Sequence, residues 1–179
     1  MSKNFWHDIE SGNDVPEIVN VIVEIPKGSM NKYEYDKKHN MIKLDRVLFS
    51  PFHYPGDYGL IPQTLSEDGD PLDALVLVTN PTYPGILIEA RPVGLLQMKD
   101  DGEMDDKIIC VATNDPRYLH TTDITNIEDH YRSEIAHFFQ VYKDLEGKKV
   151  EILGWKSAKE AKVVIIESIK RYKDTLKKY

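Results

Sequence analysis

Cysteine is almost absent from this sequence: of its 179 residues, only one is a cysteine, Cys110. No intramolecular disulfide can form, and because Cys110 stands in the apolar stretch KIICVA, we expect a buried thiol rather than a nucleophile. Long apolar runs are also missing. The N-terminal MSKNFWHDIESGND does not resemble a signal peptide, and no stretch approaches the ~20 apolar residues of a membrane helix. We therefore expect a cytoplasmic protein without a membrane partner, forming a single domain over residues 1–179.

Basic residues are too few for a general nucleic-acid-binding protein. The chain has 23 Lys and Arg against 30 Asp and Glu, which gives a formal net charge of −7. A protein that binds a polyanion along its surface needs a positive track instead. The nucleotide-binding pattern GxxxxGK[ST] is also absent, and the sequence offers no Ser-His-Asp arrangement for nucleophilic catalysis. We therefore expect no nucleic-acid partner.

Short segments of apolar or alternating residues indicate strands in most of the chain. Gly, Pro, Asn and Asp separate these segments, as is typical of strand ends and turns. The strands are predicted at residues 19–25, 32–36, 41–49, 74–78, 86–91, 93–98, 107–112 and 148–153. Many short strands with this punctuation suggest a small closed β-barrel.

Two amphipathic helices are predicted in the C-terminal third. The patterns Thr125-x-x-Glu128 and Ser157-x-x-Glu160 both match the capping box that begins a helix. Apolar residues then recur at helical spacing, as far as Tyr142 in the first segment and Leu176 in the second. The expected fold class is α+β, with the barrel flanked by these two main helices.

Three aspartates stand close together where an apolar strand begins. Asp68, Asp70 and Asp73 fall within EDGDPLD, directly before ALVLV. A solvated turn would explain this composition, since Asp, Gly and Pro are turn residues. A calcium-binding EF-hand loop does not fit, because Leu72 and Asp73 stand where that loop has Asp or Asn and then Gly.

A second acidic segment, KDDGEMDDK at 99–107, connects two predicted strands as a hairpin. If the strands pair directly, Asp100 and Asp105 face each other, and like charges opposed in a sheet are destabilising. Two acidic loops on the ends of apolar strands therefore indicate a cation site. Carboxylate oxygens suit Mg²⁺, Mn²⁺ or Ca²⁺ better than structural zinc. The histidines show no ligand spacing, and we interpret His137 as a packing or interface residue.

Several basic and phenolic residues leave two interpretations open. Arg46 shares a strand face with apolar residues, so it forms either a structural ion pair, with Glu24 or Glu34, or a clamp for an anion. Lys107 either neutralises the acidic loop or binds substrate. Four further residues have either a structural role or a role in the site: Tyr54, Tyr58, Tyr142 and Lys143. Together these residue types fit a polyanionic substrate bridged by divalent metal ions.

The sequence resembles the family I soluble inorganic pyrophosphatases, in particular the prokaryotic type. Asp68-Gly-Asp-Pro-Leu-Asp73 matches the family signature. Four further segments follow in family order: VEIPKGSMNKYEYDK, LDRVLFSPFHYPGDYGLIPQTL, RPVGLLQMKDDGEMDDK and IAHFFQVYKDLEGKKVEILGW. The resemblance implies a five-stranded OB-like barrel with flanking helices, a homohexamer with His137 near a subunit contact, and several Mg²⁺ ions per site, with Mn²⁺ or Zn²⁺ as substitutes. The implied reaction is hydrolysis of pyrophosphate to two orthophosphates by metal-activated water, without a covalent enzyme intermediate.

The resemblance also assigns roles to individual residues. It implies that the metal ions are held by Asp68, Asp70, Asp73, Asp100, Asp105 and Glu24, and that Asp70 is the general base. It implies that pyrophosphate is bound by Lys32, Glu34, Arg46, Tyr54, Lys107, Tyr142 and Lys143, with Tyr58, Arg46 and Lys32 also in the catalytic set. One position departs from the pattern: Asp101 stands where many bacterial members carry a longer Glu.

Two rival hypotheses stay open, one from another class of protein and one from within the enzymes. A non-catalytic OB-like module for nucleic acid or acidic polymers would need a cationic surface, which the net charge of −7 opposes. A magnesium-dependent hydrolase of nucleotides or polyphosphate would use the same carboxylates, although no aromatic platform for a base is evident.

Overall fold

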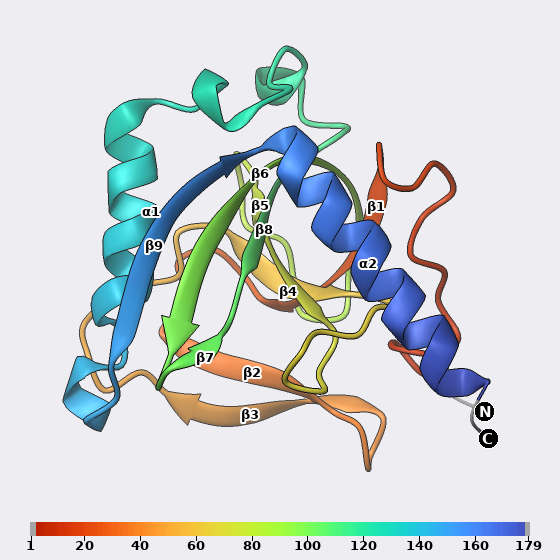
Figure 1. Ribbon diagram of the computed structural model, residues 1–179. Helices are drawn as coiled ribbons and strands as arrows, with labels where there is room; N and C mark the ends of the chain where they lie inside the picture. Colours follow the sequence, from red (N-terminus) through yellow and green to blue (C-terminus); the bar gives the residue numbers. More distant parts are fainter. Residues whose placement is uncertain (1–2, 178–179) are drawn as a thin grey trace.

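A ring of paired strands forms the centre of the computed structural model, which describes residues 3–177 (Figure 1). The strands of the ring are β1 (Val19–Ile25), β4 (Asp57–Ile61), β5 (Leu72–Leu77), β8 (Lys107–Ala112) and β6 (Leu87–Asp100). They are hydrogen-bonded in this order, and β1 also pairs with β6, which closes the ring. All of these pairs are antiparallel except β5 with β8, which is parallel.

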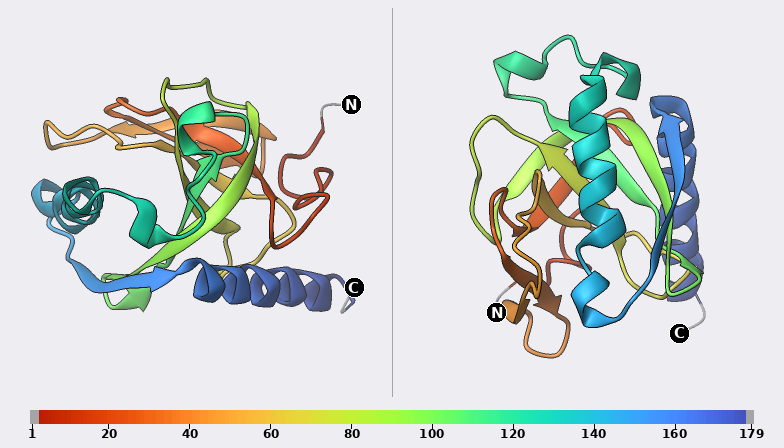
Figure 2. Two further views of the ribbon diagram at one scale, coloured as in Figure 1. Left: turned by 90° about the horizontal axis from the view of Figure 1, so that it is seen from above. Right: turned by 90° about the vertical axis from the view of Figure 1, so that its left-hand side faces the viewer.

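The remaining elements surround this ring. The short strand β7 (Glu103–Met104) and the strand β9 (Val150–Ser157) both pair with β6, while β2 (Asn31–Asp36) and β3 (Met41–Val47) form a separate hairpin. The helices are α1 (Asp129–Val141) and α2 (Ala158–Leu176), and 3-10 turns occupy Pro116–Tyr118, Ile124–Asn126 and Asp144–Glu146. The two helices lie on different sides of the strands, as both views in Figure 2 show. None of the described helices is long and apolar enough to cross a membrane.

Successive side chains of the ring strands point to opposite faces of the sheet, and this divides the core into two clusters. Leu75 and Leu77 of β5 belong to the cluster that contains Phe138 and Phe139 of α1. The intervening residues of β5 belong to a second cluster, which also contains residues of β1, β8 and α2. Cys110 is in this second cluster; it is fully buried, and burial raises the pKa of its thiol, which confirms the expected inert cysteine.

Several predicted elements have different boundaries in the structure. The strands predicted at 86–91 and 93–98 are one long strand, β6, in which Pro92 and Gly94 flank a β-bulge instead of a break. Strand β9 begins at Val150 instead of 148 and ends at Ser157 instead of 153. None of the predicted strands covers residues 57–61, which form β4. The Gly and Pro signals therefore concealed a strand.

One of the two predicted capping boxes is wrong. Ser157 and Glu160 do form the reciprocal cap of α2. At the first helix, Asp123 instead accepts the backbone N–H of Thr125 and caps a short 3-10 turn, and the chain is extended at Ile127. Helix α1 therefore begins only at Asp129, and Glu128 makes no side-chain cap.

The expected opposition of Asp100 and Asp105 is also wrong. Asp100 pairs with Glu103, because the hairpin closes through a tight turn at Asp101 and Gly102, whose φ angles are 49° and 91°. Asp105 lies beyond the short strand β7, where its N–H donates to the carbonyl of Met98.

Gly59 permits the close approach of β1 and β4. A Cβ atom at this position would lie 1.9 Å from the carbonyl oxygen of Ile22. We predict that Gly59→Ala lowers the free energy of unfolding by about 3 kcal/mol, because the added methyl forces the strands apart. Urea unfolding measures this loss. Gly28→Ala is the control: its Cβ meets open space, so only the strain at φ +83° remains, about 1 kcal/mol. Equal losses would contradict the packing argument.

Candidate active site

A cleft of about 660 Å³ is lined by residues of the β2–β3 hairpin, the two acidic loops and the segment after α1. It brings together most residues that the sequence singled out: Glu24, Lys32, Glu34, Tyr58, Asp68, Asp70, Asp73, Asp100, Asp105, Lys107, Tyr142 and Lys143. Arg46 and Tyr54 are not among its lining residues, and their assigned roles stay predictions.

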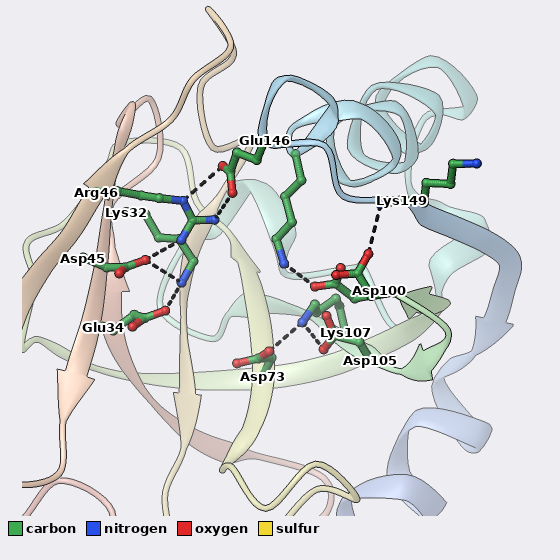
Figure 3. Close-up of polar contacts among 12 residues, drawn as sticks. Lys32, Glu34, Asp45, Arg46, Asp73, Asp100, Asp105, Lys107, Glu146 and Lys149 are labelled. Carbon is green, nitrogen blue, oxygen red and sulfur yellow. Dashed lines mark hydrogen bonds and ion pairs between the residues drawn. The ribbon is translucent and has the colours of Figure 1, made fainter.

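Lys107 lies between two of the predicted metal ligands. The parallel register of β5 and β8, which places Ala74 beside Ile108, brings Asp73 next to Lys107. The Lys107 Nζ donates to Asp73 Oδ2 at 2.6 Å and also contacts Asp105 (Figure 3). The side chain of Lys107 is 3% exposed. Burial disfavours its charged form, but the carboxylates of Asp73 and Asp105 outweigh that effect and raise the pKa of Lys107. The buried ammonium therefore remains charged.

The other aspartates line the same cleft. Asp68 accepts the backbone N–H of Asp70 at 2.9 Å, which shapes the acidic loop, and burial raises the pKa of the Asp68 carboxyl. Asp100 Oδ2 contacts the ammonium of Lys143. Its other oxygen, Oδ1, is buried and accepts no hydrogen bond from any described residue. Buried acceptors are rarely left unpaired, so this oxygen points to a ligand.

The donors in the cleft fit a hard divalent cation. They are carboxylate oxygens, and the orphaned Oδ1 of Asp100 lies among them. In residues 3–177 no three Asp, Glu, His or Cys side chains already converge into a metal-holding group. Lysine ammonium groups lie against Asp70, Asp73, Asp100 and Asp105.

Glu24 differs from the exposed acids of the loops. Its buried carboxylate oxygen accepts the backbone N–H of Tyr35 at 2.6 Å. Burial, with a smaller contribution from the negative charge of Asp73, raises the pKa of Glu24 to about 8. Without a metal ion, Glu24 is therefore largely protonated at pH 7. Binding of a metal by Glu24 would require loss of that proton.

Arg46 forms a two-point ion pair with a residue that the sequence did not indicate. Its Nε and Nη2 donate to the carboxylate of Glu146 at 3.0 and 2.8 Å, and its Nη1 contacts Asp45 (Figure 3). The expected partners, Glu24 and Glu34, are not bound to it. Burial opposes the charge of Arg46, but Glu146 and Asp45 outweigh this effect and raise its pKa.

The remaining phosphate contacts predicted from the sequence fall into two groups. Lys32 contacts Glu34 and lies 3.5 Å from Asp45, so it stands beside Arg46. The tyrosine rings form an aromatic group, in which Tyr54 lies behind Tyr58 with 5.5 Å between ring centroids. Burial raises the pKa values of Tyr54, Tyr58 and Tyr142 well above the usual range, so their hydroxyls remain protonated.

Asp101 and His137 have structural contacts. The Asp101 carboxylate accepts the N–H of Lys149 at 3.2 Å, and the Asp101 N–H donates to the Lys149 carbonyl, so Asp101 ties its hairpin to the start of β9. Asp101 also lines the cleft. His137 is exposed on α1, and its ring meets the ring of Phe52 edge-on at 5.9 Å.

Sequence reasoning missed several charged residues of this region. Glu146 and Asp45 hold Arg46, while Lys37 and Lys148 line the cleft. The available signal for Lys37 was its place between the strands predicted at 32–36 and 41–49. No local pattern could identify Glu146, because its contact with Arg46 spans 100 residues.

Comparison with known proteins identifies the family. Residues 21–173 match the sequence family described as inorganic pyrophosphatase. The inorganic pyrophosphatase of Halobacterium salinarum is 52% identical over 90% of this chain and 92% of its own length, and that of Haloferax volcanii is 51% identical over 96% and 97%. The crystal structure of inorganic pyrophosphatase from Thermus thermophilus superimposes with a TM-score of 0.93 at 47% identity, over 96% of this chain and 99% of the other. The chain belongs to the inorganic pyrophosphatase family.

The buried ammonium of Lys107 leads to a prediction about stability. We predict that Lys107→Met lowers the free energy of unfolding by about 2 kcal/mol without metal, because Asp73 and Asp105 lose their shared partner. These carboxylates are partly exposed, so the loss is smaller than for a fully buried pair. Mg²⁺ should then raise the melting temperature of the variant more than that of the parent. Differential scanning calorimetry at fixed ionic strength measures both effects.

Lys148→Met is the matched control for this experiment. It removes the same charge from the cleft, but Lys148 forms no ion pair with the described residues. Equal stability losses in the two variants would show that only the total charge matters, and would contradict the role given to Lys107.

Proposed function

We propose that this chain hydrolyses pyrophosphate to two orthophosphates in the cleft, with water as the nucleophile and no covalent enzyme intermediate. Family membership supports the reaction. One observation assigns this reaction to the cleft: its walls carry both the carboxylates of the acidic loops and lysines that face them. Such a lining suits a polyanion that arrives together with divalent cations.

Mg²⁺ is the proposed cofactor, with Mn²⁺ or Zn²⁺ as substitutes. The residues that would hold it are Asp68, Asp70, Asp73, Asp100 and Asp105, with Glu24 once it has lost its proton. When bound, the cation lowers the pKa of water and offsets the negative charge of the phosphates. The unpaired Oδ1 of Asp100 and the exposed carboxylate of Asp70 support this assignment.

The basic and phenolic residues would bind and orient the substrate. Lys32 and Arg46, on neighbouring strands of the hairpin, would hold the outer oxygens of one phosphate. Lys143, with the protonated hydroxyls of Tyr58 and Tyr142, would donate to the others. Arg46 is already fixed by Glu146, so binding would not require ordering of its long side chain. Lys107, Glu34 and Tyr54 complete the proposed set.

Asp70 would act as general base in the hydrolytic step. A water oxygen forms a bond to one phosphorus atom, the bond from that phosphorus to the bridging oxygen breaks, and the proton of the water passes to the Asp70 carboxylate. The lysines would take up the charge that develops on the leaving phosphate. Each orthophosphate then leaves by the mouth of the cleft.

We also propose that the ring of strands is a closed five-stranded OB-like barrel, that residues 1–179 form one domain, and that the chain forms a homohexamer in the cytoplasm. The order of pairing around the ring and the TM-score of 0.93 support the first of these proposals. The exposed position of His137 on α1 is compatible with a contact between subunits.

A phosphate-release assay tests the proposed reaction directly. The purified protein is incubated with pyrophosphate, ATP or tripolyphosphate at pH 7.5, with Mg²⁺ and with a chelator. We predict rapid release from pyrophosphate with Mg²⁺, at least ~10²-fold slower release from ATP and tripolyphosphate, and loss of activity with the chelator. Faster release from ATP or tripolyphosphate would favour the rival nucleotide or polyphosphate hydrolase.

The role of Asp70 predicts a specific kinetic defect. Asp70→Asn retains the shape of the side chain, and the exposed position of Asp70 means that the variant should fold normally. We predict that its kcat falls by at least ~10²-fold at pH 7, because the amide cannot accept the proton of water. Higher pH should restore part of this loss. A pH–rate profile at saturating Mg²⁺ measures the effect.

Glu67→Gln is the control for Asp70→Asn, because it removes a neighbouring negative charge that does not line the cleft. Melting curves confirm that each variant is folded. If folded Asp70→Asn retained kcat within about threefold of the parent, Asp70 would not be the general base.

A further inference from the structure

The turn of the β2–β3 hairpin places a lysine against the proposed general base. Lys37 directly follows β2, and its Nζ donates to Asp70 Oδ1 although the two residues are 33 positions apart. Both residues line the cleft. The contact is open to solvent, since the side chains of Lys37 and Asp70 are 46% and 62% exposed. An ion pair this exposed is weak and can be displaced.

An aromatic ring holds the lysine over the acidic loop. The Nζ of Lys37 lies 4.5 Å from the centroid of the Trp6 ring, within the range of a cation–π interaction. Trp6 is itself fixed, because its Nε1 donates to the carbonyl of Thr64 at 2.8 Å and its own carbonyl accepts the N–H of Gln63. Lys37 therefore has two partners, one inside the cleft and one beside it.

The hairpin turn directs the neighbouring lysine differently. The Asp36 carboxylate accepts the backbone N–H groups of Lys38 and His39, which fixes the turn. Lys38 also lines the cleft, but its ammonium pairs with no acidic group in residues 3–177. The chain thus carries two adjacent lysines of equal charge, of which one contacts Asp70 and the other does not.

We propose that Lys37 is a positioning residue for Asp70, acting as an internal counterion that a divalent cation displaces. This inference rests on the proposed function of the cleft. Without the cation, the ammonium of Lys37 holds the Asp70 carboxylate and offsets its repulsion from the other aspartates of the loop. A doubly charged ion that reaches several carboxylates at once outcompetes a single exposed ammonium. Lys37 then leaves Asp70, and its ammonium shifts relative to the Trp6 ring.

Direct binding of Mg²⁺ without substrate tests this proposal. Isothermal titration calorimetry at pH 8 and fixed ionic strength gives the Mg²⁺ affinity of the parent, Lys37→Met, Lys38→Met and Lys37→Arg. We expect Lys37→Met to bind Mg²⁺ about threefold more tightly than Lys38→Met, because only Lys37 competes for Asp70. Lys37→Arg, which retains the competing charge, should bind like the parent.

Tryptophan emission provides a second readout that does not depend on affinity. Mg²⁺ should change the emission of the parent protein as the ammonium beside Trp6 moves. This change should be absent in Trp6→Phe, which retains Trp155 as the other tryptophan, and strongly reduced in Lys37→Met. In Lys38→Met it should match the parent.

The outcomes separate this inference from the proposed function. If the parent hydrolyses pyrophosphate and binds Mg²⁺, but Lys37→Met and Lys38→Met change the affinity equally, the pair is an ordinary surface contact and the inference is overturned. The same conclusion follows if Mg²⁺ leaves the emission of Trp6 unchanged. If the parent neither binds Mg²⁺ nor hydrolyses pyrophosphate, the proposed function fails and the inference fails with it.

Discussion

The shared ion pair of Lys107 with Asp73 and Asp105 is the constraint on which the cleft depends. Each carboxylate lies at the end of an apolar segment, and the parallel pairing of β5 with β8 brings them together around one buried ammonium. Without a positive charge at this place, the repulsion between the carboxylates would oppose the same strand pairing that forms the core. The same contact therefore stabilises the pairing of the strands and balances the negative charges of the cleft.

The overall acidity of the chain does not oppose an anionic substrate, because the charge is distributed unevenly. The net charge is −7, yet Lys32, Lys107 and Lys143 are largely buried beside the carboxylates of the cleft. Arg46 stands beside Lys32 and is held by Glu146. Local fields from such partly buried groups are screened less by salt than those of the exposed surface. A pyrophosphate–magnesium complex in the cleft would therefore interact with these basic groups, and the net charge of the whole chain would matter less.

The sequence predicted the parts of the fold that follow from local periodicity. Strand 19–25 and the end of α2 at Leu176 agree with the structure because their apolar spacing and the Ser157 cap are local signals. Strand β4 was missed because Gly59, required by close packing against Ile22, looks like a loop signal when the neighbouring strand is unknown. The hairpin register at Asp100 depended on backbone angles at Asp101 and Gly102, which charge patterns do not reveal.

The candidate site was predictable to a similar extent. The acidic loops and the lysines lie in one cleft, as the sequence indicated. The partner of Arg46 was not predictable, because Glu146 comes from a turn after α1 and no spacing rule links the two. Lys37 was overlooked for the same reason, since its contacts with Asp70 and Trp6 exist only after the hairpin folds over the loop.

The long separation between Arg46 and Glu146 has a consequence for biosynthesis. A chain emerges from the ribosome N-terminus first, and contacts between distant residues form late because a large loop must close. The hairpin that carries Arg46 appears about 100 residues before the turn that carries Glu146. Until that turn has emerged, Arg46 lacks the two-point ion pair with Glu146. All strands of the ring, which end at Ala112, are therefore synthesised before the network around Arg46 can be completed.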